Sequence, residues 1–83
     1  MESEPAEKIK KMFFVYKENI VLYKAKKYVE CAVNCEKITF ELDSLQLSKI
    51  KDIGKQNTCR QIRRELLNQT GKIHKSCIVK LNS

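Results

Sequence analysis

Residues 44–65, SLQLSKIKDIGKQNTCRQIRRE, decide the fold, because a lone glycine separates two short apolar-patterned segments that both carry basic residues. Glycine tolerates the left-handed backbone that often ends a helix, so Ile53-Gly54 predicts a helix end. Asp43 or Ser44 is the expected N-cap of the short helix before it. That helix would place three apolar residues in the core: Leu45, Leu47 and Ile50.

A second helix is expected directly after this glycine. Asn57 or Thr58 is its predicted N-cap, since both side chains can accept a hydrogen bond from a free backbone N–H. The apolar residues of this helix that we expect to face inward are Cys59, Ile62 and Leu66. Its outward face would carry Arg60, Arg63 and Arg64. The pair of helices is compatible with three alternatives. It could be a helix-turn-helix that binds nucleic acid, the hinge of a small helical bundle whose basic face receives an acidic partner, or a pair of helices with a packing role alone.

The rest of the chain also has a helical period. We expect a first helix after Pro5, a break at the KAKK run of residues 24–27, a second helix from about Tyr28, and an irregular crossing at residues 39–42. Gly71 would close a further connection before a last helix. The apolar stripes of these helices are Ile9, Met12, Phe13, Tyr16, Ile20 and Tyr23; Cys31, Cys35 and Ile38; and Ile73, Cys77 and Leu81. The sequence therefore predicts an all-α bundle of four to five helices, with residues 1–5 disordered and residues 6–83 forming one domain.

Charge is unevenly distributed along the 83 residues, whose net charge is +7. Residues 1–48 hold equal numbers of acidic and basic side chains, whereas residues 49–83 hold nine basic side chains against Asp52 and Glu65. A basic protein favours acidic partners such as phosphate, anionic lipid or acidic protein segments. We therefore expect the partner surface in the second half of the chain.

The N-terminus, MESEPAEKIKK, is charged and lacks the apolar run of a signal peptide. The longest apolar stretch is interrupted by Lys17 and Glu18, so no membrane span is expected. These features favour an intracellular protein, and we expect it to be a monomer.

The four cysteines and the single histidine raise the question of a metal site. Cys31 and Cys35 lie one turn apart, and His74 lies three residues before Cys77. Structural zinc sites usually present two tight cysteine pairs on loops, whereas these cysteines fall on apolar helix stripes, where a thiol acts as a small hydrophobe. We expect buried free thiols, no metal and no cofactor. No phosphate loop or paired carboxylates accompany His74, which argues against an enzyme.

The segment SLQLSKIKDIGK resembles the TLxLLxxTxIGK signature of the N-terminal domain of transcription elongation factor S-II, a module also called the LW domain and found in Elongin A and a Mediator subunit. Downstream, TCRQIRRE is similar to the family's TVNKLRKH after an insertion of two residues, and IHKSCIVKL is similar to LAKSLIKSW. The resemblance covers residues 28–81. It departs from the family in three places: Arg60 replaces an asparagine, Leu81 replaces a tryptophan, and the family's Pro-Ile-Thr turn before the third helix is missing.

This resemblance implies a nuclear, non-catalytic docking domain that binds short disordered segments of elongation or chromatin proteins, segments that combine acidic residues with an aromatic or aliphatic anchor. The partner-binding residues expected on the basic face are Lys55, Arg60, Arg63, Arg64, Lys72 and Lys75. The residues expected to be structural are Leu45, Leu47, Ile53, Gly54, Ile62, Ile73 and Cys77.

Two other interpretations remain open. Residues 57–67 fit a basic helix that binds DNA or RNA through phosphate contacts. Residues 20–43 loosely resemble the helix pair of one tetratricopeptide repeat, which would change the fold but leave the protein a binding module.

Overall fold

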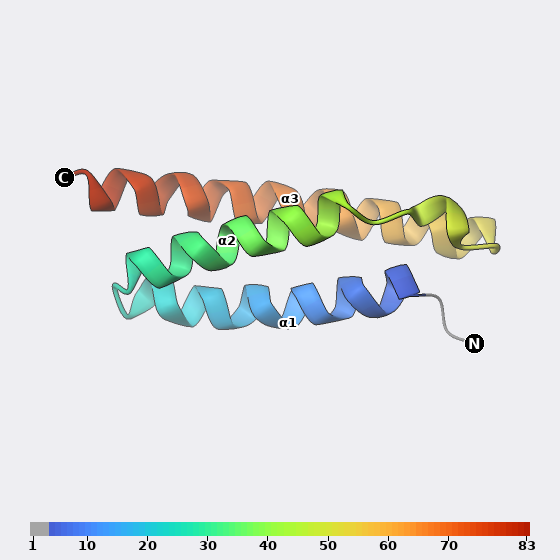
Figure 1. The fold of residues 1–83 in the computed structure, drawn as a ribbon, viewed down its shortest axis with the longest axis horizontal. Coiled ribbons are helices and arrows are strands. Elements are labelled where there is room, and N and C mark those ends of the chain that lie inside the picture. The colour runs from blue at the N-terminus through green and yellow to red at the C-terminus, as the bar shows by residue number, and fades with distance from the viewer. Residues whose placement is uncertain (1–3) are drawn as a thin grey trace.

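The computed structural model describes residues 4–83 as three α-helices and one 3₁₀ turn (Figure 1). They are α1 (Glu4–Lys24), α2 (Tyr28–Asp43), the 3₁₀ turn η1 (Leu47–Lys49) and α3 (Ile53–Leu81). Helices α1 and α2 form an antiparallel hairpin, and α3 runs back along both in an elongated bundle of 46 × 18 × 16 Å. The all-α prediction is confirmed, but three helices replace the expected four to five. The structure begins α1 at Glu4, inside the segment predicted to be disordered, and residues 1–3 lie outside the described part.

Helix α1 ends where the KAKK run predicts. Lys26 has a φ of 64°, the left-handed conformation that commonly follows a helix. The amide of Lys27 donates to the carbonyl of Leu22 at 2.9 Å, and the amide of Lys26 donates to that of Tyr23 at 3.0 Å. This pair of bonds is a Schellman motif, in which two otherwise free carbonyls at the helix end are satisfied.

Helix α2 starts at Tyr28, as expected, but continues through residues 39–42, so the predicted irregular crossing is wrong. Packing overrides the modest helix propensity of this segment, because Leu42 extends the buried stripe by one more turn. The Thr39 hydroxyl donates to the carbonyl of Cys35 at 2.9 Å, so its hydrogen bond is made to the preceding turn of the same helix. Residues 20–43 are thus the end of α1 and all of α2, which differs from a tetratricopeptide helix pair.

The expected short helix after Ser44 is only the single turn η1. Ser44 is the C-cap of α2 rather than an N-cap, since its amide donates to the carbonyl of Phe40. Leu47 and Ile50 are buried and Leu45 is half-buried, so the turn still closes one end of the core. The Gln56 side-chain amide donates to the carbonyls of Leu47 and Ile50 at 3.1 and 3.2 Å, which ties this turn to α3.

Gly54 does not end a helix, which corrects the central prediction. It lies in the first turn of α3, and its φ is not positive. The N-cap is Asp52, whose side chain accepts a hydrogen bond from the amide of Lys55 at 3.1 Å. A Cβ at position 54 would lie 3.2 Å from the Asp52 Oδ1 atom. The glycine therefore leaves room for the capping carboxylate.

Helix α3 is continuous for 29 residues, so the predicted cap at Asn57 or Thr58 and the predicted connection at Gly71 are also wrong. Each interior glycine costs a helix about 1 kcal/mol relative to alanine. The spacing of its buried residues explains why α3 nevertheless stays intact: Leu66, Thr70 and Cys77 repeat at four and seven residues and pack along the whole hairpin.

The core consists of two clusters. The aliphatic cluster comprises Ile9, Met12, Ile38, Leu42, Leu47, Ile50 and Leu66. The thiol cluster comprises Cys31, Ala32, Cys35 and Cys77, with Leu22, Tyr23, Tyr28 and Ile73 packed against it. Two residues expected to be structural lie outside both clusters, since Ile53 is 67% exposed and Ile62 is 42% exposed.

Candidate docking surface on α3

Three of the predicted partner-binding residues surround one hollow on α3. Arg60, Arg63 and Arg64 line an open depression of about 400 Å³ together with Leu67 and Asn68. Arg60 and Arg64 are exposed, whereas Arg63 and Leu67 are half-buried. The hollow therefore joins three guanidinium groups to one apolar side chain, which is what an acidic segment with an apolar anchor requires.

The arginines of this hollow have no acidic partner among the residues that the structure describes. Among the described residues, the Lys8 ammonium pairs with the Glu41 carboxylate at 3.2 Å, and the Nε2 atom of His74 lies 3.5 Å from the Glu36 carboxylate. Arg60 donates only to the side-chain carbonyl of Asn57, at 3.4 Å. A guanidinium group binds carboxylates in a planar, two-point geometry, so these groups can receive an external acid without first breaking an internal ion pair.

Lys75 shares this face of α3, whereas Lys72 and Lys55 lie beside it, Lys72 next to Arg64 and Lys55 next to Arg63. Successive helical residues are separated by about 100°, so Lys75 lies within about 20° of Arg64 and Lys72 within about 80°. By the same rule, Lys55 points about 180° away from Arg64. Lys55 lies about 140° from Arg60 but only about 80° from Arg63, so along the continuous α3 it approaches the arginines only on the side of Arg63.

Two features of this face were not predicted from the sequence. Ile78 is 41% exposed and lies five full turns from Arg60, so it falls on the same side of α3. Gly71 also lies on this side, and no atom would contact a Cβ placed on it within 4 Å. The face thus presents apolar contacts and an open backbone between its basic residues. The predicted connection at Gly71 concealed that these residues share one face, because a helix break there would have changed the register of all later residues.

The buried cysteines interact mainly with each other and with one polar side chain. The Asn19 amide donates to the Cys35 sulfur at 3.0 Å, and the Cys31 thiol donates to the carbonyl of Asn19 at 3.5 Å. Burial raises the pKa of both Cys31 and Cys35, which favours the neutral thiol. All four cysteines are free, and residues 4–83 contain no group of three or more His, Cys, Asp or Glu side chains arranged to hold a metal ion.

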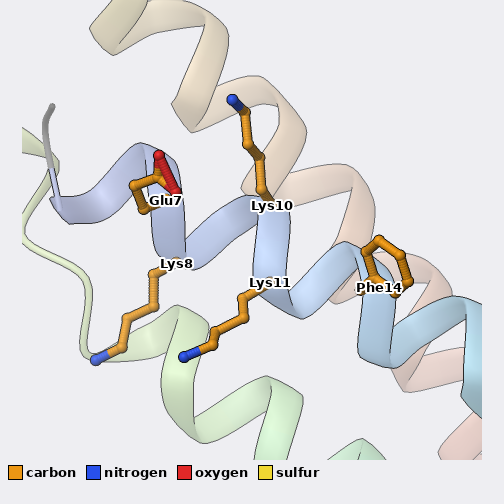
Figure 2. Close-up of a pocket in the computed structure, with 5 residues that line it drawn as sticks. All are labelled: Glu7, Lys8, Lys10, Lys11 and Phe14. Atoms are coloured by element: carbon orange, nitrogen blue, oxygen red, sulfur yellow. The ribbon is translucent and has the colours of Figure 1, made fainter.

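A second basic hollow lies on α1, in the half of the sequence whose charges balance. It measures about 490 Å³ and is lined by Glu7, Lys8, Lys10, Lys11 and Phe14. Figure 2 shows that Lys8 and Lys11 extend from one side of α1 and Lys10 from the other. Phe14 is 70% exposed. The sequence pattern did not predict this surface, because Phe13 rather than Phe14 was expected on the apolar stripe of the helix.

No family model, characterised protein or solved structure matches the chain. None of the helices in the described range has both the length and the apolar character to cross a membrane. The resemblance to the S-II N-terminal domain therefore stays a prediction.

Proposed function

We propose that this chain is a non-catalytic docking domain of the transcription elongation machinery, which binds short acidic segments with an apolar anchor on the arginine face of α3. Its nuclear location and LW-type fold are part of the same proposal and rest on the resemblance of residues 28–81. The single observation that carries the proposal is the hollow lined by Arg60, Arg63 and Arg64, whose guanidinium groups have no described acidic partner.

The proposed binding mode divides between charge and apolar contact. Arg60, Arg64 and Lys75 span about 22 Å of α3, from the helical rise of 1.5 Å per residue, and would attract acidic side chains of a bound segment. Leu67 lines the hollow and would contact the apolar anchor of the bound segment. The open space over Gly71 would let the segment approach the helix backbone closely.

A titration of the labelled domain with an acidic, aromatic-containing peptide at physiological salt tests this proposal. Chemical-shift changes should concentrate at residues 60–78 and spare α1. The variant Arg60→Glu/Arg64→Glu should stay folded and lose binding by at least about 100-fold, since the two lost charge-assisted contacts together remove about 3 kcal/mol or more. The matched control, Lys11→Glu/Lys24→Glu, changes the net charge equally on α1 and should bind as the wild type does. Equal loss in both variants would reduce the effect to net charge and overturn the proposed surface.

Nucleic acid is the second candidate occupant, because Arg60, Arg64, Lys72 and Lys75 form an exposed basic strip that could follow a phosphate backbone. Salt distinguishes the two occupants. Affinity that rests on phosphate contacts falls steeply between about 50 and 200 mM salt, whereas a peptide with an apolar anchor loses affinity more gently. Steep salt dependence with a short DNA duplex, without any response to the peptide, would replace the docking function by nucleic-acid binding.

A further inference from the structure

Helix α1 carries an exposed stripe that the docking face on α3 does not use. We call it the basic stripe; its residues are Lys10, Phe14, Lys17, Val21 and Lys24. Spacings of four, three, four and three keep all five within about 80° around the helix. Phe14 is 70% exposed and Val21 is 65% exposed. The Lys17 ammonium lies 4.8 Å from the centre of the Phe13 ring, a cation–π contact that holds this lysine on the surface.

Helix α2 carries an exposed stripe of the same spacing and the opposite charge. We call it the acidic stripe; its residues are Val29, Val33, Glu36, Phe40 and Asp43. These also lie within about 80° of one another. Val29 is 63%, Val33 60% and Phe40 70% exposed, so the three large apolar side chains lie in solvent on one face. An isolated exposed residue is ordinary, but an aligned apolar stripe marks an interaction surface.

The two stripes match each other residue by residue when they are aligned antiparallel. Phe14 then faces Phe40, and Val21 faces Val33. Lys17 faces Glu36, and Lys10 faces Asp43. At the end of the alignment Lys24 faces Val29, over which its aliphatic stem can pack. Apolar layers alternate with oppositely charged layers, which is the arrangement expected of two helices that pair with each other.

The stripes cannot meet within one molecule, because they point away from each other. Lys8 marks the side of α1 that contacts α2, through its ion pair with Glu41. Lys17 lies nine residues beyond Lys8, about 180° around α1. Glu36 lies five residues before Glu41, about 140° around α2. The two surfaces therefore lie on opposite edges of the α1–α2 hairpin.

We propose that the basic stripe of one copy of this chain binds the acidic stripe of a second copy, head to tail. Because the two surfaces differ and lie on opposite edges, the contact leaves one stripe free at each end and can add further copies. One contact thus accounts for both exposed stripes. An anionic membrane would bind the basic stripe but repel Glu36 and Asp43, so a second copy fits the observed charges better.

The proposed contact is weak. The basic stripe is about 21 Å long, from the rise of 1.5 Å per residue, and a single helix pair of that length falls in the class of small interfaces. A dilute solution should hold the monomer expected from the sequence. Association should appear as the protein concentration approaches the millimolar range, at a Kd of roughly 0.1–1 mM.

Sedimentation equilibrium of the full chain, up to about 1 mM, tests the proposal. Two variants each remove one surface at unchanged net charge: Phe14→Ser/Val21→Ser on α1 and Val33→Ser/Phe40→Ser on α2. Each alone should associate about thirtyfold more weakly than the wild type. Mixed together, they should form a one-to-one complex that does not grow, since one intact stripe remains on each. The control Ile53→Ser/Val79→Ser removes equally exposed apolar residues outside both stripes and should associate normally.

Charge exchange provides the second test, and circular dichroism verifies that every variant is folded. Lys17→Glu should weaken association about five- to tenfold, and adding Glu36→Lys to the same chain should restore it. A monomeric wild type at about 1 mM would overturn the proposal, as would a mixture of the serine variants that stays monomeric. Binding of anionic vesicles that Phe14→Ser/Val21→Ser abolishes, without self-association, would assign the basic stripe to a membrane surface instead.

Discussion

The two core clusters differ in what fills them. The aliphatic cluster, at the η1 end of the bundle, buries seven residues that are all large and apolar. The thiol cluster, next to the turn between α1 and α2, buries three sulfur atoms and one methyl group. Burial stabilises in proportion to apolar area, about 25 cal/mol per Å², so the aliphatic end should carry most of the folding free energy.

The two ends of the bundle also differ in the polar groups that they bury. Asn19 is fully buried and donates to the Cys35 sulfur, but its side-chain oxygen has no partner, and neither does the buried hydroxyl of Thr70. An unpaired buried polar group costs about 1–3 kcal/mol. One helical bundle can thus combine a strongly stabilising end with an end whose packing is compact but only weakly favourable.

The largest expected effect comes from truncating one fully buried residue in each cluster. Leu42→Ala should lower the free energy of unfolding by about 2–5 kcal/mol, because it leaves a cavity in the aliphatic cluster. Cys77→Ala removes one sulfur atom and should cost about 1 kcal/mol. Urea unfolding followed by circular dichroism measures both. Equal losses would show that the two ends contribute alike.

Alkaline pH should weaken the thiol end selectively. Burial raises the pKa of Cys31 and Cys35 in the folded chain, whereas unfolded thiols ionise near about pH 8.5. The contribution of these thiols is therefore complete well below that pH and falls as the pH rises through it, with a slope that approaches about 1.4 kcal/mol per pH unit for each thiol that stays neutral in the folded chain. Unfolding measured from pH 8 to about pH 9.5 should show this slope in the wild type. A Cys31→Ala/Cys35→Ala variant that loses stability just as steeply would assign the slope to other groups.

Removing the buried, unpaired hydroxyl of Thr70 should raise the stability of the folded chain. Thr70→Val keeps the side-chain shape and removes the unpaired oxygen, so the free energy of unfolding should rise by about 1 kcal/mol. Thr39→Val is the matched control on α2, because its hydroxyl donates to the carbonyl of Cys35 at 2.9 Å and its loss should not stabilise. Thermal unfolding of both variants provides the measurement. A destabilised Thr70→Val would mean that this hydroxyl is satisfied in solution.

The smallest effect is expected at a glycine outside both clusters. Gly71→Ala should raise stability by about 0.5–1 kcal/mol, since alanine is the better helix former and the new methyl group contacts nothing within 4 Å. Gly54→Ala is the control, because its methyl group would meet the Asp52 Oδ1 atom at 3.2 Å and should gain less. Melting temperatures resolve the difference. A larger gain at position 54 would contradict the capping geometry.

Local pattern predicted the hairpin well and α3 poorly, for a physical reason. The KAKK run and the stripe of Cys31, Cys35 and Ile38 depend only on neighbouring residues, and they gave the end of α1 and the start of α2 correctly, although not the end of α2. Gly54 is ambiguous, because a glycine can follow a helix or stand in its first turn. Asp52 resolves the ambiguity, since its side chain caps the next helix, but that bond exists only once the chain after it is helical.

Local sequence pattern also predicts only part of the candidate site. The arginine hollow could be predicted, because Arg60, Arg63 and Arg64 lie within one turn whatever follows them. The position of Lys55 relative to them could not be predicted, since its direction depends on the helix being unbroken through residues 53–64. The exposed stripes of α1 and α2 could not be recognised before the inward faces were known, because both stripes contain apolar residues that suit a core equally well.

An odd number of helices has a mechanical consequence. Helix α1 starts at one end of the bundle and α3 finishes at the other, so the two ends of the described chain lie at opposite poles of a body 46 Å long (Figure 1). Proteins fused to its two ends would be separated by a rigid strut about as long as the bundle. In a two-helix hairpin, by contrast, both chain ends would lie at the same end of the bundle. Dyes attached near Pro5 and Leu81 would report this spacing by energy transfer, and unfolding of the strut would change it.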